Sequence, residues 1–273
     1  MLKIGYLGPE GTYSSYAAKL YDSENLKIPF NTINEVLNSL KSTETNQVVV
    51  PLENSINGSI VEVLDFLASK NNYHIVAELN IEINHSVYCL DSINNEDVRV
   101  VYSHPQALAQ CYDYLINNFK NAKHKASNST ADSYNDLINS TEKGVFIGPP
   151  WMKDNETVMV IGENVQSVKN NVTRFVVISD KNKNKKTISD KTSIVISFSE
   201  DSPGSLFKAL EPMAKKNINM TKIESRPTKE KLGNYYFFID IEGHFEDKDI
   251  KECLSEIKEI SSLKFLGSYP KFI

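Results

Sequence analysis

Side chains suited to binding an anion gather in four short turns of the sequence. These turns are rich in glycine, hydroxyl and amide residues and span residues 8–14, 51–59, 103–106 and 129–131. Each precedes a helical pattern of apolar residues, and a helix N-terminus offers free N–H groups and a partial positive charge. The alternative is that the hydroxyl groups only cap these helices; the hydroxyls concerned belong to Thr12, Ser59, Ser103 and Ser129. Because four such turns recur, we predict a site for a polyanion or a polycarboxylate.

The consecutive residues Thr173, Arg174 and Phe175 form a second candidate. The chain has 30 basic residues, of which only Arg99, Arg174 and Arg226 are arginine, so an arginine can mark a place that needs a planar guanidinium fork. In a β-strand, Thr173 and Phe175 share one face and Arg174 points to the other. If this strand begins at a cleft, Arg174 is suited to a bidentate contact with a carboxylate. A structural salt bridge is the alternative for Arg174.

Two ionisable side chains in the turns are candidate proton donors. Glu53 lies in the second turn and His104 in the third, and both residue types serve as general acids in enzymes. A structural role is the alternative for each. Near the C-terminus, the turn over residues 201–206 contains Pro203 and Gly204, which allow the backbone to approach a small ligand closely. The alternative is that residues 201–206 form only an ordinary turn. Residues 224–227 end a predicted strand nearby, and the alternative there is that their charged side chains form only an ion pair.

The first 179 residues alternate short apolar runs with helical patterns, which favours parallel sheets flanked by helices. The predicted strands span residues 3–7, 47–51, 97–103, 144–147 and 173–179, and the predicted helices span 13–21, 60–69, 105–117 and 131–139. Residues 75–90 form a long extended segment that could pass from one sheet to another, and 173–179 could cross back. Two crossings predict two α/β lobes with a cleft between them, and ligands bind such sheets at the carboxyl ends of strands.

A charged segment without aromatic residues or an amphipathic period, residues 180–192, predicts a linker. The remaining residues, 193–273, show a different order of elements. Strands are predicted at 193–198, 218–225, 235–242 and 263–269, and helices at 205–216 and 249–260. The order βαββαβ in about 80 residues is that of an α+β, ferredoxin-like domain.

Composition excludes several classes of protein. The formal net charge is −5 and the pI is about 5.6, which argues against a nucleic-acid partner. No apolar run approaches the roughly 18 residues of a membrane span, and the N-terminus has no secretory signal, so we expect no membrane partner. Three widely spaced cysteines fit reduced thiols in the cytoplasm. Without Cys/His clusters, GxxxxGK[ST] or GxGxxG, we expect no metal and no nucleotide cofactor.

Six motifs in this order resemble those of prephenate dehydratases over nearly the whole chain. They are GPEGTYS (8–14), PLENSINGS (51–59), SHPQALAQC (103–111), NVTRF (171–175), PGSL (203–206) and ESRP (224–227). The resemblance implies a catalytic domain over residues 1–179 with the two-lobed fold of type II periplasmic binding proteins, and an ACT regulatory domain over 193–273. Two segments depart from the family pattern. Residues 148–151 lack an Ala-rich helix start, and 204–207 replace the usual GALV with Gly-Ser-Leu-Phe.

The resemblance also implies an activity: a carbon–oxygen lyase of L-phenylalanine biosynthesis that converts prephenate to phenylpyruvate, water and carbon dioxide without a cofactor. Thr173 would hydrogen-bond the departing ring hydroxyl and Arg174 would bind a carboxylate. The other implied substrate contacts are Phe175, Thr12, Asn54, Ser55, Gly58, Ser103 and Gln110. L-Phenylalanine would inhibit the enzyme by binding between the ACT domains of two subunits in a homodimer or homotetramer. The residues implied for this effector are Gly204, Leu206, Asn219 and Met220.

Two other functions fit the same motifs. Arogenate dehydratase acts on a substrate that carries an amino group in place of the keto oxygen, and the motifs do not distinguish it. A non-catalytic amino-acid sensor could combine the same two domains and bind ligands without turnover. The intact Thr173-Arg174-Phe175 segment argues against the sensor, because binding alone does not need the hydroxyl there.

Overall fold

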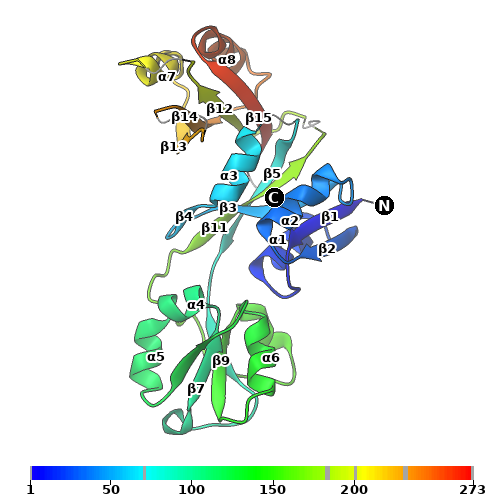
Figure 1. Ribbon diagram of the computed structural model, residues 1–273, viewed down its shortest axis with the longest axis vertical. Helices are drawn as coiled ribbons and strands as arrows, with labels where there is room; N and C mark the ends of the chain where they lie inside the picture. The colour runs from blue at the N-terminus through cyan, green and yellow to red at the C-terminus, as the bar shows by residue number, and fades with distance from the viewer. Residues whose placement is uncertain (1, 70–71, 182–184, 200–201, 230–232, 272–273) are drawn as a thin grey trace.

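The structure is a computed structural model, and it describes residues 2–69, 72–181, 185–199, 202–229 and 233–271. Three sheets follow one another along its long axis (Figure 1). Two of them belong to the lobes of the N-terminal domain, and the third belongs to the C-terminal domain. Within the described residues, no helix is both long enough and apolar enough to cross a membrane.

The first lobe is built on a sheet in the order β2-β1-β3-β11-β5, with the short β4 paired to β3. Its strands are β1 (Lys3–Leu7), β2 (Leu26–Phe30), β3 (Gln47–Asn54), β4 (Gly58–Ser59), β5 (His74–Glu82) and β11 (Val172–Ser179). Its helices are α1 (Tyr13–Tyr21), α2 (Ile33–Lys41) and α3 (Val61–Ala68). The central strands are buried on both faces, as their runs of β-branched residues require. β11 pairs antiparallel with both β3 and β5.

The second lobe contains a sheet in the order β10-β6-β9-β7-β8. Its strands are β6 (Ser86–Cys89), β7 (Val100–Ser103), β8 (Lys123–Ala126), β9 (Gly144–Gly148) and β10 (Met159–Gly162). Its helices are α4 (Pro105–Gln110), α5 (Tyr112–Asn118) and α6 (Asp132–Ile138), with short 3₁₀ turns η1 (Asn95–Asp97) and η2 (Pro150–Asp154). The chain enters this lobe between β5 and β6 and returns to the first sheet at β11 (Figure 1). The predicted pair of crossings is therefore confirmed.

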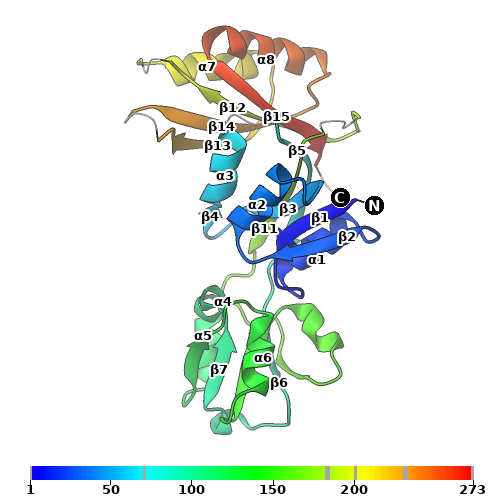
Figure 2. The same ribbon diagram turned by 45° about the vertical axis from the view of Figure 1, so that its right-hand side comes forward.

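The C-terminal domain has the predicted βαββαβ order and an antiparallel sheet, β13-β14-β12-β15. Its elements are β12 (Asp190–Ser197), α7 (Ser205–Lys215), β13 (Met220–Pro227), β14 (Tyr235–Glu242), α8 (Lys248–Ile260) and β15 (Ser262–Pro270). The two helices cover one face of the sheet, and the other face lies on the first lobe above α3 (Figure 2). One apolar cluster therefore continues across the domain boundary, from Leu64 and Leu67 to Phe238 and Leu266.

The two domains also contact each other between β15 and β5. At Gly267, which has φ +140°, a Cβ atom would lie 2.2 Å from the carbonyl oxygen of Ile75. A side chain has no room there, and few non-glycine residues adopt that backbone conformation. Glycine thus allows the sheet of the C-terminal domain to lie directly against the first lobe.

The structure differs from the sequence predictions at several elements. The patterns did not predict β2, α2, β8 or β10; β2, β8 and β10 are edge strands, whose polar or exposed residues weaken the apolar alternation. The helix predicted over residues 105–117 is interrupted at Cys111, which has a non-helical φ of −103° and ψ of 8°. Of the predicted linker, residues 190–192 belong to β12 and residues 182–184 lie outside the described part of the chain. Asp201, in the predicted turn before α7, also lies outside it.

Candidate active site

A cleft of about 650 Å³ lies between the two lobes. Its walls come from the predicted turns: Gly8, Thr12 and Ser14 of the first, Asn54 and Asn57 of the second, His104 and Gln106 of the third, and Ser129 and Thr130 of the fourth. Thr173 and Phe175 of β11 complete it, with His85 and Gln110 on the side of the second lobe. The structure therefore brings the four turns and one face of β11 to a single cavity.

Thr173 and Asn54 form a hydrogen-bonded pair on the first-lobe side of the cleft. They face each other on the paired strands β11 and β3, and the Asn54 Nδ2 atom donates to Thr173 Oγ1 at 2.9 Å. The Asn54 Oδ1 atom accepts from the backbone N–H groups of Ile56 and Asn57 at 3.0 and 3.1 Å, which fixes the orientation of the amide. Since Thr173 already accepts a bond from Asn54, its own O–H remains available to donate to a bound molecule.

Gln110 and His85 form a second pair, reached from Asn54 through Asn171. Asn54 Nδ2 donates to Asn171 Oδ1 at 2.6 Å, and Asn171 Nδ2 donates to Gln110 Oε1 at 3.2 Å. That oxygen also lies 2.9 Å from Nε2 of His85. The buried Gln110 Nε2 and His85 Nδ1 atoms have no hydrogen-bond partner within the described residues. Buried polar atoms without a partner are costly, so these two are candidates for contacts with a ligand.

Burial keeps both cleft histidines neutral near pH 7. Desolvation lowers the pKa of His85, against a smaller opposing effect of its bond to Gln110, and desolvation alone lowers the pKa of His104. If His85 donates from Nε2 to Gln110 Oε1, its Nδ1 is left as an acceptor. His104 also caps α4, because its Nδ1 accepts from Gln106 N at 3.3 Å.

Several predicted contacts have structural partners instead of facing the cleft freely. Thr12 lines the cleft but caps α1, accepting from Ser15 N at 3.2 Å. Ser103 is fully buried and donates to the carbonyl of Ile147 at 3.0 Å, so it supports the cleft from beneath. Ser55 accepts from Val172 N at 2.9 Å and lines a neighbouring pocket together with Gly58.

Arg174 does not lie in this cleft. Its side chain leaves the opposite face of β11 and is 6% exposed. The carboxylates that it contacts belong to the chain itself: Nε donates to Glu78 at 2.7 Å and Nη1 to Asp240 at 2.5 Å, while Nη2 donates to the Tyr269 hydroxyl at 2.9 Å. Burial opposes the charge, but Tyr269, Asp240 and Glu78 outweigh it and hold the pKa of Arg174 well above its ordinary value. The alternative of a structural salt bridge describes this geometry, and the expected bond to a substrate carboxylate does not.

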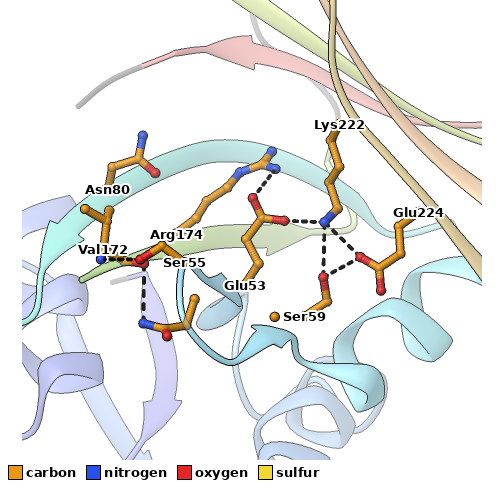
Figure 3. Close-up of a pocket in the computed structure, with 10 residues that line it drawn as sticks. Glu53, Ser55, Ser59, Asn80, Val172, Arg174, Lys222 and Glu224 are labelled. Atoms are coloured by element: carbon orange, nitrogen blue, oxygen red, sulfur yellow. Dashed lines mark hydrogen bonds and ion pairs between the residues drawn. The ribbon is translucent and has the colours of Figure 1, made fainter. Parts of the chain in front are cut away.

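Glu53 also faces away from the cleft, into a pocket of about 390 Å³ at the boundary with the C-terminal domain (Figure 3). Its carboxylate pairs with Lys222 of β13, which also lies 2.9 Å from Glu224 and 3.1 Å from Ser59 Oγ. Burial disfavours the charge of Lys222, but the bonds to Glu224 and Glu53 outweigh it and raise its pKa. A proton-transfer role in the cleft is therefore not supported for Glu53.

Among the described residues that line the cleft, none is a lysine or an arginine. Negative charge in a ligand would instead meet helix N-termini and neutral donors such as Gln110 Nε2. Among the described residues, no three His, Cys, Asp or Glu side chains are grouped so that they could hold a metal ion.

The lobes touch at one edge of the cleft through Trp151. Its indole stacks on Tyr16 of α1, with ring centroids 4.6 Å apart, and its Nε1 donates to the carbonyl of Gly11 at 3.1 Å. Gly11 itself has a φ of +89°, which suits glycine. Trp151 lies in the segment over residues 148–151 that departs from the family pattern, and in this chain it bridges the two lobes.

The four predicted effector residues lie at the ends of α7 and β13. Gly204, with φ +86°, precedes α7, and a Cβ atom at this position would meet no atom within 4 Å among the described residues beyond its chain neighbours. Leu206 and Met220 pack against the apolar cluster between the sheet and its helices, and the carbonyl of Asn219 accepts from Glu242 N at 2.9 Å.

Sequence reasoning did not single out several residues of the site, among them His85, Asn57 and Asn171. Asn57 and Asn171 stand inside the quoted motifs, so their amide side chains were visible signals. His85 lies between β5 and β6, where the chain crosses from one lobe to the other. A lone histidine in an extended segment gives no signal of its own, and only the folded cleft reveals it.

Fold and cleft together define a two-lobed, type II periplasmic-binding-protein-like enzyme with a ferredoxin-like ACT domain. A family model described as prephenate dehydratase matches residues 4–183, and an ACT domain model matches residues 192–259. The chain belongs to the prephenate dehydratase family, and it is a carbon–oxygen lyase of that family.

Relatives span nearly the whole chain. A bifunctional chorismate mutase/prephenate dehydratase of Aquifex aeolicus is 38% identical over 99% of this chain and 74% of its own length. A prephenate dehydratase of Methanocaldococcus jannaschii is 35% identical over 98% of this chain and 97% of its own. The crystal structure of prephenate dehydratase from Arthrobacter aurescens in complex with L-Phe is 30% identical, covers 99% of this chain and 90% of its own, and superposes with a TM-score of 0.88.

Proposed function

We propose that the interlobe cleft binds prephenate and converts it to phenylpyruvate, carbon dioxide and water. The observation that carries the assignment of the site is the Asn54–Thr173 pair, which leaves the Thr173 hydroxyl free to donate into the cleft. Family membership supports the choice of substrate. The reaction breaks the bond between the ring and its carboxylate, and the released electron pair enters the ring as the ring C–O bond breaks. The leaving hydroxide takes up a proton and departs as water.

Thr173 assists the departing oxygen in this proposal. Negative charge develops on that oxygen as the C–O bond lengthens, and a donor that is already oriented stabilises it without reorganisation. A threonine hydroxyl is a weak acid, so Thr173 polarises the bond or relays a proton and is not the final source of that proton. Asn54 keeps the hydroxyl aimed into the cleft, and formation of the aromatic ring provides the driving force.

The two carboxylates of the substrate are held by uncharged groups. The nine-residue helix α1 begins at the cleft and directs its N-terminal N–H groups and partial positive charge toward it. Gln110 Nε2 is a buried donor that lacks a protein partner among the described residues. Orientation between these donors and Thr173 keeps the ring carboxylate aligned with the breaking bonds. We keep Asn54, Gln110, Thr12 and Phe175 as substrate contacts, and we assign Arg174, Ser55, Gly58 and Ser103 to the support of the cleft.

Regulation by L-phenylalanine is the second part of the proposal. The related Arthrobacter aurescens enzyme has been crystallised with L-Phe, and the present chain carries an ACT domain. We propose that L-phenylalanine binds near Gly204, Leu206, Asn219 and Met220, between the ACT domains of two subunits in a dimer or tetramer. Isothermal calorimetry on the full chain tests this step, and no heat of binding at millimolar L-phenylalanine would contradict it.

The cytoplasm is the proposed location. All three cysteines, Cys89, Cys111 and Cys253, are free and buried. Burial raises the pKa of Cys111 to about 12 and that of Cys253 to about 11, so their thiols stay protonated. Thiols of this kind fit a reducing compartment.

A side-by-side rate comparison tests the proposed reaction. The purified chain is incubated with prephenate and, separately, with arogenate, and the aromatic product of each is followed by its ultraviolet absorbance. We expect turnover of prephenate to be faster. Faster turnover of arogenate would assign the cleft to the amino-acid substrate, and binding of either without product would identify a sensor.

A further inference from the structure

Two pairs of neighbouring residues connect the cleft to the regulatory domain. In the register of β11 and β3, Thr173 lies opposite Asn54 and Arg174 lies opposite Glu53. Because successive side chains of a strand point to opposite faces, Thr173 and Asn54 face the cleft while Arg174 and Glu53 face the ACT domain. Any shift of Arg174 or Glu53 along the strands therefore moves the backbone of the residue that lines the cleft.

Side chains of the regulatory domain bind both Arg174 and Glu53, on the face of β11 and β3 that is turned away from the cleft. Asp240 of β14 binds the guanidinium of Arg174 at 2.5 Å and is 4% exposed. Lys222 of β13 binds the carboxylate of Glu53, which itself lies 3.8 Å from Arg174 (Figure 3). Asp240, Arg174, Glu53 and Lys222 thus form one continuous ion-pair network between β14 and β13, on the side of β11 and β3 that faces the ACT domain.

The burial of this cluster makes it a firm anchor. Arg174 is surrounded on three sides, by Glu78 from its own lobe and by Asp240 and Tyr269 from the ACT domain. A buried charge must keep its partners, because a charge left alone in the interior is strongly unfavourable. The guanidinium therefore cannot move without its regulatory-domain partners.

We propose that Asp240 and Lys222, both in the regulatory domain, are positioning residues for the active site: they hold Arg174 and Glu53, and through these the Asn54–Thr173 pair. The inference rests on the proposed function of the cleft. It assigns the ACT domain a part in basal turnover, beyond any effector that the domain binds.

Two variants of the full chain test the proposal. Asp240→Asn keeps the size of the side chain but removes its charge, and Lys222→Gln breaks the bond to Glu53 at a less buried position. We expect each variant to lower kcat for prephenate about tenfold and to leave KM within about twofold, since a small misplacement of a reacting group is costly. If Asp240→Asn does not fold, Lys222→Gln decides the question.

Asp65→Asn is the matched control. Asp65 of α3 accepts from Arg226 at 3.2 Å and from Lys229 at 2.6 Å, so it forms ion pairs across the same domain boundary without contacting β3 or β11 through them. We expect its kcat to stay within about twofold of the wild-type value. If Asp65→Asn lowers kcat as much as the two test variants do, any ion pair across the domain boundary has this effect. That result would overturn the proposal.

Hydrogen exchange measured by mass spectrometry gives a readout that does not depend on activity. We expect the amides of residues 172–176, 50 and 52–54 to exchange about tenfold faster in Asp240→Asn and Lys222→Gln, but not in Asp65→Asn, because local opening becomes easier. Unchanged exchange and unchanged kcat in both test variants would refute the positioning role. If exchange is faster in both test variants but the wild-type protein does not turn over prephenate, the structural link between the domains is supported and the proposed reaction is refuted.

Discussion

Replacement of Arg174 by lysine separates the two roles that have been considered for this residue. Lysine keeps the positive charge but presents a single ammonium group instead of a planar fork. It can reach one of the two carboxylates, Glu78 or Asp240, and leaves the other carboxylate and the Tyr269 hydroxyl without that donor. Because these groups are buried, the change acts on the folded state.

The magnitude follows from the bonds that are lost. A hydrogen bond to a charged group contributes about 1.5–3 kcal/mol, so we expect Arg174→Lys to lower the free energy of unfolding by about 2–3 kcal/mol. Removal of the charge, as in Arg174→Met, leaves the buried Asp240 without its cation, whereas Glu78 keeps its ion pair with Lys191 at 2.7 Å. The loss of this buried partner is expected to cost about 3–5 kcal/mol. Since the guanidinium does not face the cleft, KM for prephenate should stay within about twofold of the wild-type value.

Urea unfolding and steady-state kinetics on the same preparations provide the assay. Arg99→Lys is the matched control, because Arg99 donates to the backbone carbonyls of Glu96 and Val98 in the second lobe. If Arg174 bound a substrate carboxylate, Arg174→Lys would raise KM by a factor on the order of 10 to 100. That rise, together with wild-type stability, would refute the assignment of Arg174 to the domain boundary.

Three further predictions concern the cleft. Thr173→Val should lower kcat by a factor of about 10² to 10³ with little change in KM, because a preorganised donor to the leaving oxygen is lost; a kcat within about fivefold of wild type would exclude that role. Gln110→Glu replaces a buried donor by a negative charge facing a dianion, so KM should rise by at least about tenfold, and an unchanged KM would remove Gln110 from the binding site. Burial lowers the pKa of His85 and of His104, so below about pH 6.5 the unfolded chain binds more protons and stability falls as the pH drops from 7 to 5. His85→Gln should flatten that slope in thermal melts, whereas an equal slope would contradict the burial of a neutral imidazole.

Much of the fold could be predicted because its signals are local. The alternation of β-branched runs and amphipathic segments predicted the helix Tyr13–Tyr21 and the strand Tyr235–Glu242 with the bounds that the structure shows. The extended segment after residue 74 indicated the passage between the lobes. Edge strands such as β8 were not predicted. The sequence of β8, Lys-His-Lys-Ala, has no apolar alternation, and this strand is held by its pairing with β7.

The site could be predicted only in part, because its geometry depends on distant residues. Strand alternation correctly separated Thr173 from Arg174, but nothing local shows which face of β11 meets the cleft. The partners that decide this for Arg174 are Asp240 and Tyr269, which lie 66 and 95 residues further along the chain. Ser103 likewise lies in a motif, and only the pairing of β7 with β9 shows that its hydroxyl points inward to the carbonyl of Ile147.

The most direct test of the proposed mechanism is the structure of the Thr173→Val variant with prephenate bound, since this variant should retain the substrate long enough to be observed. We predict that the ring hydroxyl lies within about 4 Å of the side chain of residue 173. The carboxylates should then contact the start of α1 and Gln110, and Arg174 should remain bound to Glu78 and Asp240. A substrate carboxylate seated on Arg174, or a ring hydroxyl directed away from residue 173, would contradict the account.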